Sequence, residues 1–177
     1  MIMDNLKRSP SLVESFKEVS PDDVRLERRE VKLYEELMLH IESSEGRLER
    51  RGVRIEIDAD PALQILSYPR VLLKVMEELI INSFVHGFAE RKTGHIYIHM
   101  FVEANKLVII YKDDGAGIEA SIRPHIFEPF TTSQRHAGRV GLGMHVAFNL
   151  ITNLLNGTIE CVPEQDIGSE FHLHIPL

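Results

Sequence analysis

The chain has 177 residues, of which 44% are hydrophobic and 27% are charged, a composition that suits one globular domain with a sizeable core. Its formal charge of −7 argues against non-specific binding of nucleic acid, because an acidic surface repels the phosphate backbone. No apolar run approaches the length that crosses a bilayer, no signal peptide opens the chain, and the single cysteine, Cys161, excludes a disulfide framework. We therefore expect a soluble domain in a reducing compartment, which can still be a piece of a membrane protein.

The first thirty residues differ from the rest of the chain. Leu12, Phe16 and Val19 recur at helical spacing, residues 20–23 break this pattern, and residues 22–30 are densely charged. We interpret them as a short helix that has lost its packing partner, followed by an extended linker, as in a chain cut from a longer protein.

The remaining residues predict alternating helices and strands. Apolar residues at three- and four-residue spacing predict helices, alternating or β-branched apolar residues predict strands, and residues 61–69 are expected to be irregular. In chain order we expect a helix at 33–50, a strand at 53–57, a helix at 71–84, strands at 96–101 and 107–112, a loop-rich span at 119–143, a helix at 144–155, and a hairpin-like pair of strands at 158–162 and 170–175. This order predicts an α+β two-layer sandwich, a mixed β-sheet covered on one face by helices. The strict βαβ alternation of a Rossmann fold is missing.

The strand predicted at 107–112 ends in two acids and two glycines. A carboxylate fixed at a strand end, here Asp113, can accept a hydrogen bond from an amino group but would repel a phosphate. Gly115 and Gly117 remove side-chain bulk, so a ligand can approach the backbone closely. The stretch suggests the base end of a nucleotide site, and an ordinary Asp-Gly turn is the alternative.

Two polar residues share one face of the apolar helix predicted at 71–84. Glu78 and Asn82 are four residues apart, and the amide oxygen of Asn82 is a hard ligand that Mg²⁺ accepts beside phosphates. Glu78 could orient a water molecule or act as a base. The alternative is that both residues cover the solvent side of the helix, and His86, one turn further on, fits either a surface residue or a ligand contact.

A second glycine pair comes directly before the helix predicted at 144–155. Gly141, Leu142, Gly143 and Met144 open that helix, where exposed backbone N–H groups make an anion site, although a flexible hinge has the same sequence. The loop at 126–132 before it carries two phenylalanines and a proline, which predict a local anchor that packs onto the body of the domain.

Two histidine patterns are interpreted as structural. His172 and His174 alternate on the last strand and could form a metal pair, but the sequence places no third ligand beside them, so we expect a solvated strand face. His40 lies on the first predicted helix, and nothing around it supports a role as a phosphate acceptor.

The order and spacing of these motifs resemble the GHKL ATPase superfamily. The pattern is an Asn on a helix, Asp-x-Gly-x-Gly-Ile after a strand, Phe-x-Pro-Phe, Gly-Leu-Gly before a helix, and Gly-Ser-x-Phe in the last strand. Within that superfamily the chain is most similar to the catalytic ATP-binding domain of bacterial sensor histidine kinases, over residues 31–177. Residues 1–30 resemble the end of the dimerisation helix and the linker of those kinases, without the helix that carries the acceptor histidine.

The resemblance implies ATP and Mg²⁺ as cofactors and assigns roles to residues of this chain. It implies that Asp113 accepts the adenine amino group, that Asn82 holds Mg²⁺ with Glu78 as a second candidate ligand, and that Glu78 and Asn82 are the catalytic residues. The implied nucleotide contacts are Asn82, His86, Asp113, Gly115, Gly117, Ile118, Phe130, Thr131, Thr132, Arg139, Gly141, Leu142, Gly143, Met144 and Ser169. Thr131 and Thr132 would lie on a mobile lid, with residues 134–139 as its mobile segment.

The chain departs from the family pattern at several positions. Glu78 stands where many histidine kinases have asparagine, and Val85 stands where many have a basic residue. Arg139 replaces the first glycine of the usual Gly-x-Gly-Leu-Gly, and Ser133 replaces a common lysine. Arg139 could itself supply positive charge for the phosphates.

The resemblance implies transfer of the ATP γ-phosphate to a histidine on a separate dimerisation domain, with a response regulator as a further partner. The chain alone would then bind ATP without phosphorylating itself, and its parent would be a homodimer with this domain in the cytoplasm and an anchor in the inner membrane.

Three alternative functions stay open. Glu78 and the Asn-x-x-x-His-Gly sequence at 82–87 also suit an anti-sigma-type serine kinase, Glu78 could activate water in a gyrase-type ATP hydrolase, and Val85 and Arg139 could mark a binding module that has lost activity.

Overall fold

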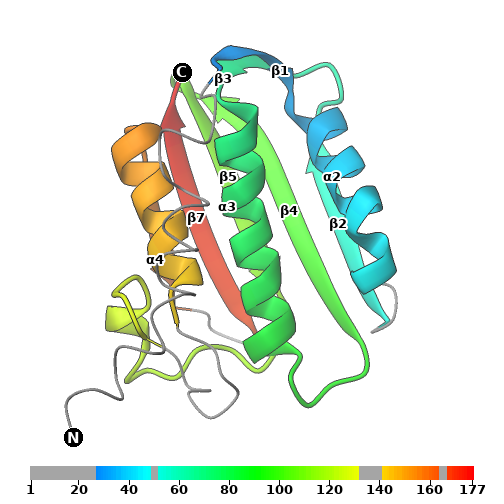
Figure 1. The fold of residues 1–177 in the computed structure, drawn as a ribbon, viewed down its shortest axis with the longest axis vertical. Coiled ribbons are helices and arrows are strands. Elements are labelled where there is room, and N and C mark those ends of the chain that lie inside the picture. Colours follow the sequence, from blue (N-terminus) through cyan, green and yellow to red (C-terminus); the bar gives the residue numbers. More distant parts are fainter. Residues whose placement is uncertain (1–26, 49–51, 132–140, 164–166) are drawn as a thin grey trace, which may run out of the picture.

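The computed structural model describes residues 27–48, 52–131, 141–163 and 167–177 (Figure 1). The predicted helix and linker at residues 1–26 lie outside the described residues. No helix within the described part of the chain is long and apolar enough to cross a membrane.

A five-stranded mixed sheet forms one layer of the molecule. Its strands lie in the order β2-β4-β5-β7-β6, with β2 parallel to β4 and every other pair antiparallel. Their bounds are Val53–Ala59 for β2, Gly94–Glu103 for β4, Lys106–Asp113 for β5, Ser169–Pro176 for β7 and Thr158–Val162 for β6. The predicted mixed sheet and the predicted pairing of the last two strands are confirmed.

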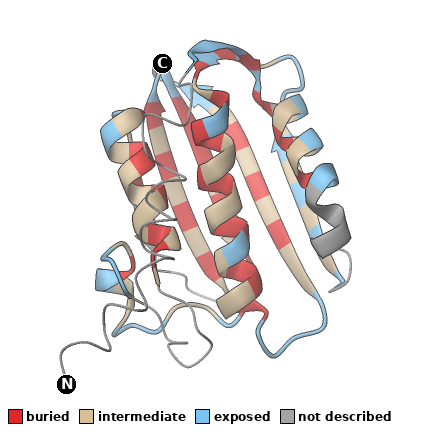
Figure 2. Cartoon of the chain, in the orientation of Figure 1, coloured by how far each residue is buried: buried red, intermediate tan, exposed pale blue. Residues whose placement is uncertain are grey.

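Helices of the described part of the chain cover one face of this sheet (Figure 1). They are α2 at Leu33–Leu48, α3 at Pro69–Asn82 and α4 at Gly143–Asn149. Side chains on the helix-facing side of the strands, among them Tyr111 and Phe171, are fully buried against these helices. The alternation of buried and part-exposed residues along β4 and β7 follows the two-residue period of a strand (Figure 2). The predicted α+β two-layer sandwich is therefore confirmed.

A small second sheet corrects the prediction for residues 61–69. Strand β3, Gln64–Ser67, pairs antiparallel with β1, Arg29–Lys32, whereas we expected no regular structure in this span. Val31 and Ile65, which are paired across the two strands, are both buried in the core. A four-residue strand bounded closely by prolines shows too little alternation to be recognised, and its pairing depends on a distant segment.

Helices α3 and α4 each lead into a π-helical turn. After α3 comes the turn Ser83–Gly87, closed by the Phe88 N–H donating to the Ser83 carbonyl at 2.8 Å. After α4 comes Leu150–Leu154, so the helix predicted at 144–155 is present with a changed geometry in its second half. π-turns are uncommon and are often found at functional sites. The first of the two leads directly into the region described next.

Candidate functional site

A cavity of about 850 Å³ opens between α3, the loop after β5 and the start of α4. This volume is in the range of pockets that hold a cofactor-sized molecule. Its lining comes from segments far apart in the sequence, so it depends on the whole fold. The predicted site residues that line it are Glu78, Asn82, His86, Gly117, Ile118, Thr131, Gly141, Leu142, Gly143, Met144 and Ser169.

Asp113, at the end of β5, lies just beneath this lining. Its side chain is only 3% exposed, and its carboxylate accepts hydrogen bonds from Ser83 Oγ at 2.7 Å and from the Gly115 N–H at 2.9 Å. Ser169, which lines the cavity, also donates to it. Burial raises the pKa of Asp113, and the hydrogen bonds from Ser83, Gly115 and Ser169 offset this effect only in part.

The glycines around Asp113 are required by close backbone contact. A Cβ atom on Gly115 would lie 2.5 Å from the Gly87 Cα and 2.8 Å from Asp113 Oδ1. A Cβ atom on Gly87 would lie 3.2 Å from the same carboxylate oxygen. Gly87 lines the cavity and Gly115 packs directly behind it. The two glycines therefore bring the cavity wall to within contact distance of the buried carboxylate.

Ser83 and Tyr111 form a buried polar chain that the sequence analysis missed. Ser83 Oγ lies 2.8 Å from the Tyr111 hydroxyl, and that hydroxyl donates to the Leu79 carbonyl at 3.2 Å. Burial raises the pKa of Tyr111 well above its ordinary value, so this hydroxyl stays protonated. The only signal for Ser83 in the sequence is its position directly after Asn82. Its place on the turn that faces the end of β5 is visible only in the structure.

Glu78 faces the cavity and not bulk solvent. Its side chain is 12% exposed, Oε1 forms an ion pair with Lys74 Nζ at 2.9 Å, and Oε2 lies beside Gly143, where an added Cβ atom would come within 2.6 Å. Burial alone would lower the pKa of Lys74, but hydrogen bonds and charge from Glu78 and Glu77 raise it overall. The idea that Glu78 covers the solvent side of its helix is therefore wrong. Lys74 lies four residues before Glu78, a spacing that the sequence analysis did not use.

The start of α4 is joined to the loop that precedes it. Gly141 has φ +70° and its carbonyl accepts a hydrogen bond from the Phe130 N–H at 2.9 Å, while an added Cβ atom would lie 2.8 Å from the Thr131 carbonyl oxygen. Phe127 stacks on Phe148 with 5.4 Å between ring centroids, which confirms the predicted local anchor. The first N–H groups of an α-helix have no acceptor within the helix, and the residues at the start of α4, Leu142, Gly143 and Met144, line the cavity.

The remaining predicted contacts fall outside the lining. Phe130 is 47% exposed and does not line the cavity. Thr132, Arg139 and the lid segment at 134–139 lie outside the described residues. Glu90 and Arg91 line the cavity without having been predicted, and Arg91 pairs with Asp114 through Nη2 at 3.4 Å. No sequence motif marks these two residues.

The last strand holds a side-chain cluster that could not be assembled from the sequence. We found no third ligand for the pair His172 and His174, but Glu160 of β6 lies directly opposite His172 in the sheet. Potential ligand atoms of these three side chains lie within 4.8 Å of one another. Cross-strand register is not visible in the sequence, so the carboxylate could not be assigned there.

The comparisons with known proteins identify the family. The model of the family described as "Histidine kinase-, DNA gyrase B-, and HSP90-like ATPase" matches residues 68–177, which include α3, the Asp113 turn and α4. The chain belongs to this family. The resemblance stated in the sequence analysis is thus confirmed at the level of the superfamily.

Relatives and solved structures agree with this assignment. Sensor histidine kinase RcsC of Escherichia coli (strain K12) is 30% identical over 169 residues, which cover 92% of this chain and 17% of RcsC. The Acinetobacter baumannii histidine kinase AdeS shares the fold with a TM-score of 0.74 and 22% identity, over 98% of this chain and 81% of that one. The histidine kinase ThkA, solved with the response regulator TrrA, has a TM-score of 0.72 and 22% identity, over 99% of this chain and 49% of that one. The chain therefore spans about a sixth of the length of RcsC.

Proposed function

We propose that this chain binds ATP with Mg²⁺ in the cavity and is the catalytic domain of a sensor histidine kinase. The observation that carries the proposal is the buried carboxylate of Asp113 beneath one part of the cavity, with Asn82 and the start of α4 lining another. A nucleotide needs an acceptor for its base and cationic or N–H partners for its phosphates, and we assign the first role to Asp113 and the second to the part of the cavity lined by Asn82 and the start of α4.

Asp113 is the proposed recognition group for adenine. Its partners among the described residues, Ser83, Gly115 and Ser169, are neutral donors that hold the carboxylate in one orientation. A carboxylate accepts a hydrogen bond from an exocyclic amino group and repels phosphate, which fixes the direction of the nucleotide in the cavity. Gly117 and Ile118, which follow it in the lining, bound the base on that side.

The donor set at the other end fits a Mg²⁺–phosphate group. The amide oxygen of Asn82 is a neutral, hard ligand, and a cation of this kind is held by few protein ligands together with phosphates and water. Mg²⁺ would supply charge neutralisation at the phosphates, and ATP the transferred phosphoryl group. The N–H groups at the start of α4 orient the phosphates, and Gly143 leaves room for their approach. The chain contributes positioning and electrostatics, and no covalent step on this domain is needed.

The alternative functions are less well supported. A hydrolase requires Glu78 to activate water, but one oxygen of Glu78 is committed to Lys74. The relatives reported above are named histidine kinases, which gives no support to an anti-sigma-type serine kinase. The two marks of a binding module that has lost activity were Val85, which lines the cavity, and Arg139, which lies outside the described residues.

The wider assignment concerns the parent protein. We assign the phosphate acceptor to a histidine on a separate dimerisation domain, a response regulator as the next partner, a homodimeric parent, and a cytoplasmic place for this domain. The structurally similar ThkA was solved with a response regulator, which supports the class of partner. In the full-length parent, label from [γ-³²P]ATP should be lost on acid treatment and survive alkali, as expected for phosphohistidine. Acid-stable label would instead point to the serine kinase.

Asn82→Ala tests the cation part of the proposal. We expect the affinity for a non-hydrolysable ATP analogue, measured by calorimetry, to fall about tenfold or more with Mg²⁺ present, because a ligand to the cation is gone. With EDTA the variant and the wild type should bind equally weakly. Asn153→Ala, on the exposed side of the turn after α4, is the matched control and should bind like the wild type. Equal Mg²⁺ dependence in Asn82→Ala and wild type would contradict the assignment.

A further inference from the structure

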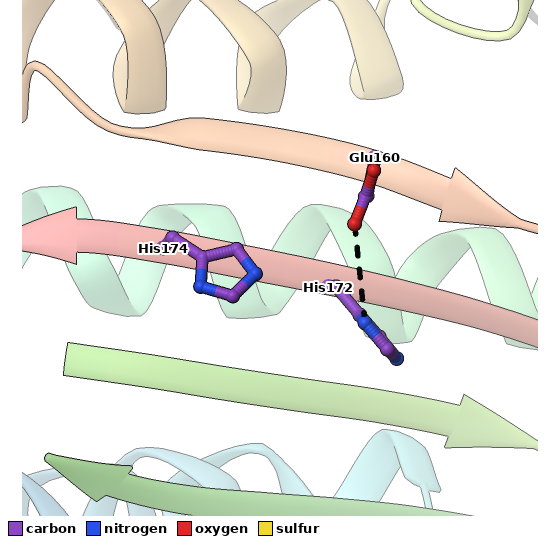
Figure 3. Close-up of side chains that lie close together, drawn as sticks. All are labelled: Glu160, His172 and His174. Carbon is purple, nitrogen blue, oxygen red and sulfur yellow. Dashed lines mark ion pairs between the residues drawn. The ribbon is translucent and has the colours of Figure 1, made fainter. Parts of the chain in front are cut away.

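The face of the sheet that points away from the helices carries a cluster of potential metal ligands. Glu160 lies on the edge strand β6, and His172 and His174 lie on the neighbouring strand β7 (Figure 3). Glu160 Oε1 is 4.0 Å from His172 Nδ1, and the ligand atoms of all three side chains lie within 4.8 Å of one another. Glu160 is exposed and both histidines are half-buried, so an ion can reach them from solvent.

The register of the two strands brings these side chains together. Glu160 pairs directly with His172, and His174 follows two residues later on the same face. Two ligands of a tetrahedral Zn²⁺ with bonds of about 2.0–2.1 Å lie about 3.4 Å apart. The observed separations of up to 4.8 Å exceed this value only slightly, so we expect side-chain rotation to suffice for binding.

A second carboxylate orients His172. Its Nε2 lies 2.5 Å from Glu170 Oε1, and the other oxygen of Glu170 pairs with Lys112 Nζ at 2.9 Å. Since a carboxylate only accepts, Nε2 is the donor, and in the neutral ring the lone pair of Nδ1 then faces Glu160. Metal-bound histidines commonly donate their other ring N–H to a carboxylate in this way. This arrangement is an observation independent of the three-residue cluster itself.

We propose that Glu160, His172 and His174 bind a divalent transition-metal cation, with Zn²⁺ as the expected ion. Two imidazoles and a carboxylate suit Zn²⁺, whereas Mg²⁺ and Ca²⁺ take oxygen ligands. Three protein ligands leave a fourth position for water or for a further ligand. The site is separate from the nucleotide cavity, because Ser169, the β7 residue in the cavity lining, points to the opposite face of the sheet from His172 and His174. A bound ion would tie the edge strand β6 to β7.

Calorimetric titration of Zn²⁺ into the chain, without nucleotide, tests the proposal. We expect one saturable site with a dissociation constant below about 100 µM, weakened at least tenfold in His174→Ala and in Glu160→Gln. His99→Ala removes an imidazole of similar exposure from the same sheet face and should leave Zn²⁺ binding unchanged. An excess of Mg²⁺ should not compete.

Melting temperature gives a second readout and a control for folding. Zn²⁺ should raise the melting temperature of the wild type and of His99→Ala. It should not raise the melting temperature of the double variant His172→Ala, His174→Ala. Glu160 is 65% exposed, so Glu160→Gln should melt like the wild type when no metal is added. Absence of saturable binding by the wild type, or undiminished binding by a folded double variant or by Glu160→Gln, would overturn the proposal.

Discussion

Asp113 is a carboxylate that the fold buries at a cost. Taking a charged group out of water is unfavourable, and its partners among the described residues are neutral donors, so its pKa is raised by burial. An apolar residue at this strand end would avoid this desolvation cost. A role in binding a ligand in the adjacent cavity accounts for a charged residue at this buried position.

The raised pKa of Asp113 gives a defined pH dependence. The folded chain holds the proton of Asp113 to a higher pH than the unfolded chain, whose pKa is about 3.9, so the contribution of this group to stability falls as pH rises between the two pKa values. Urea unfolding of wild type and Asp113→Asn from about pH 4 to about pH 8 should show that the variant gains stability relative to wild type with rising pH. A stability difference that does not change with pH would contradict the burial cost.

We expect Ser83 to stabilise the folded chain through its contacts with two buried polar groups, the Asp113 carboxylate and the Tyr111 hydroxyl. Ser83→Ala removes a hydrogen bond to Asp113 and a contact with the Tyr111 hydroxyl, both buried. Both groups keep other partners, so the expected cost is that of one lost buried hydrogen bond to a charged group, about 1.5–3 kcal/mol, measurable by urea denaturation. Ser121→Ala, at an exposed position, is the control and should change the free energy of unfolding by less than about 0.5 kcal/mol. An equal, small effect for both variants would show that the buried chain contributes nothing.

At the scale of elements, the turn after β5 and the turn after α3 depend on each other. Gly115 and Gly87 are in backbone contact, and the Ala116 N–H donates to the Gly87 carbonyl at 2.9 Å. The strand end that carries Asp113 is therefore held directly against the π-turn that carries Ser83.

Gly115→Ala should disrupt this contact. Its Cβ atom would lie 2.5 Å from the Gly87 Cα, which is backbone and cannot rotate away. Overpacking of this kind costs about 1–3 kcal/mol, and thermal unfolding would detect it as a lower melting temperature. Ala116→Ser, at the exposed neighbouring position, should melt like the wild type. A Gly115→Ala variant as stable as wild type would show that the two turns can separate freely.

The elements predicted from the sequence are the ones with long periodic patterns. The helix that begins at Pro69 and the strand that ends at Asp113 carry enough regularly spaced apolar residues to be recognised. Strand β3 has only four residues, and its partner is a segment more than thirty residues away, so it was missed. In the candidate site, residues in glycine motifs were found, whereas Ser83 was not, because its role arises only where a helix end meets a strand end.

At the scale of the whole molecule, a ligand in the cavity would join segments from nearly the full length of the domain. The lining runs from α3 through the loop after β5 to α4 and β7. Occupation of the cavity should therefore favour the folded state as a whole and not one loop. The proposed metal cluster also depends on more than one element. The register of β6 against β7, which could not be predicted from the sequence, brings its ligands together from two strands.

Nucleotide should raise the melting temperature of the intact chain. A ligand at about one hundred times its dissociation constant stabilises the folded state by about 2.7 kcal/mol. For a chain of this size the melting temperature should rise by about 5–11 °C, measured by calorimetry with the ATP analogue and Mg²⁺. The same concentration of analogue with Asn82→Ala should give a smaller shift. A shift of equal size with inorganic triphosphate would indicate that the base contributes nothing.

The most direct test of the account is the affinity of wild type and Asp113→Asn for the ATP analogue with Mg²⁺, measured by titration calorimetry. We predict one saturable site in the wild type and a loss of about 10- to 100-fold in the variant, the effect expected when a hydrogen bond to a charged group is removed. Absence of saturable binding by the wild type, or equal affinity in a folded Asp113→Asn variant, would contradict the account.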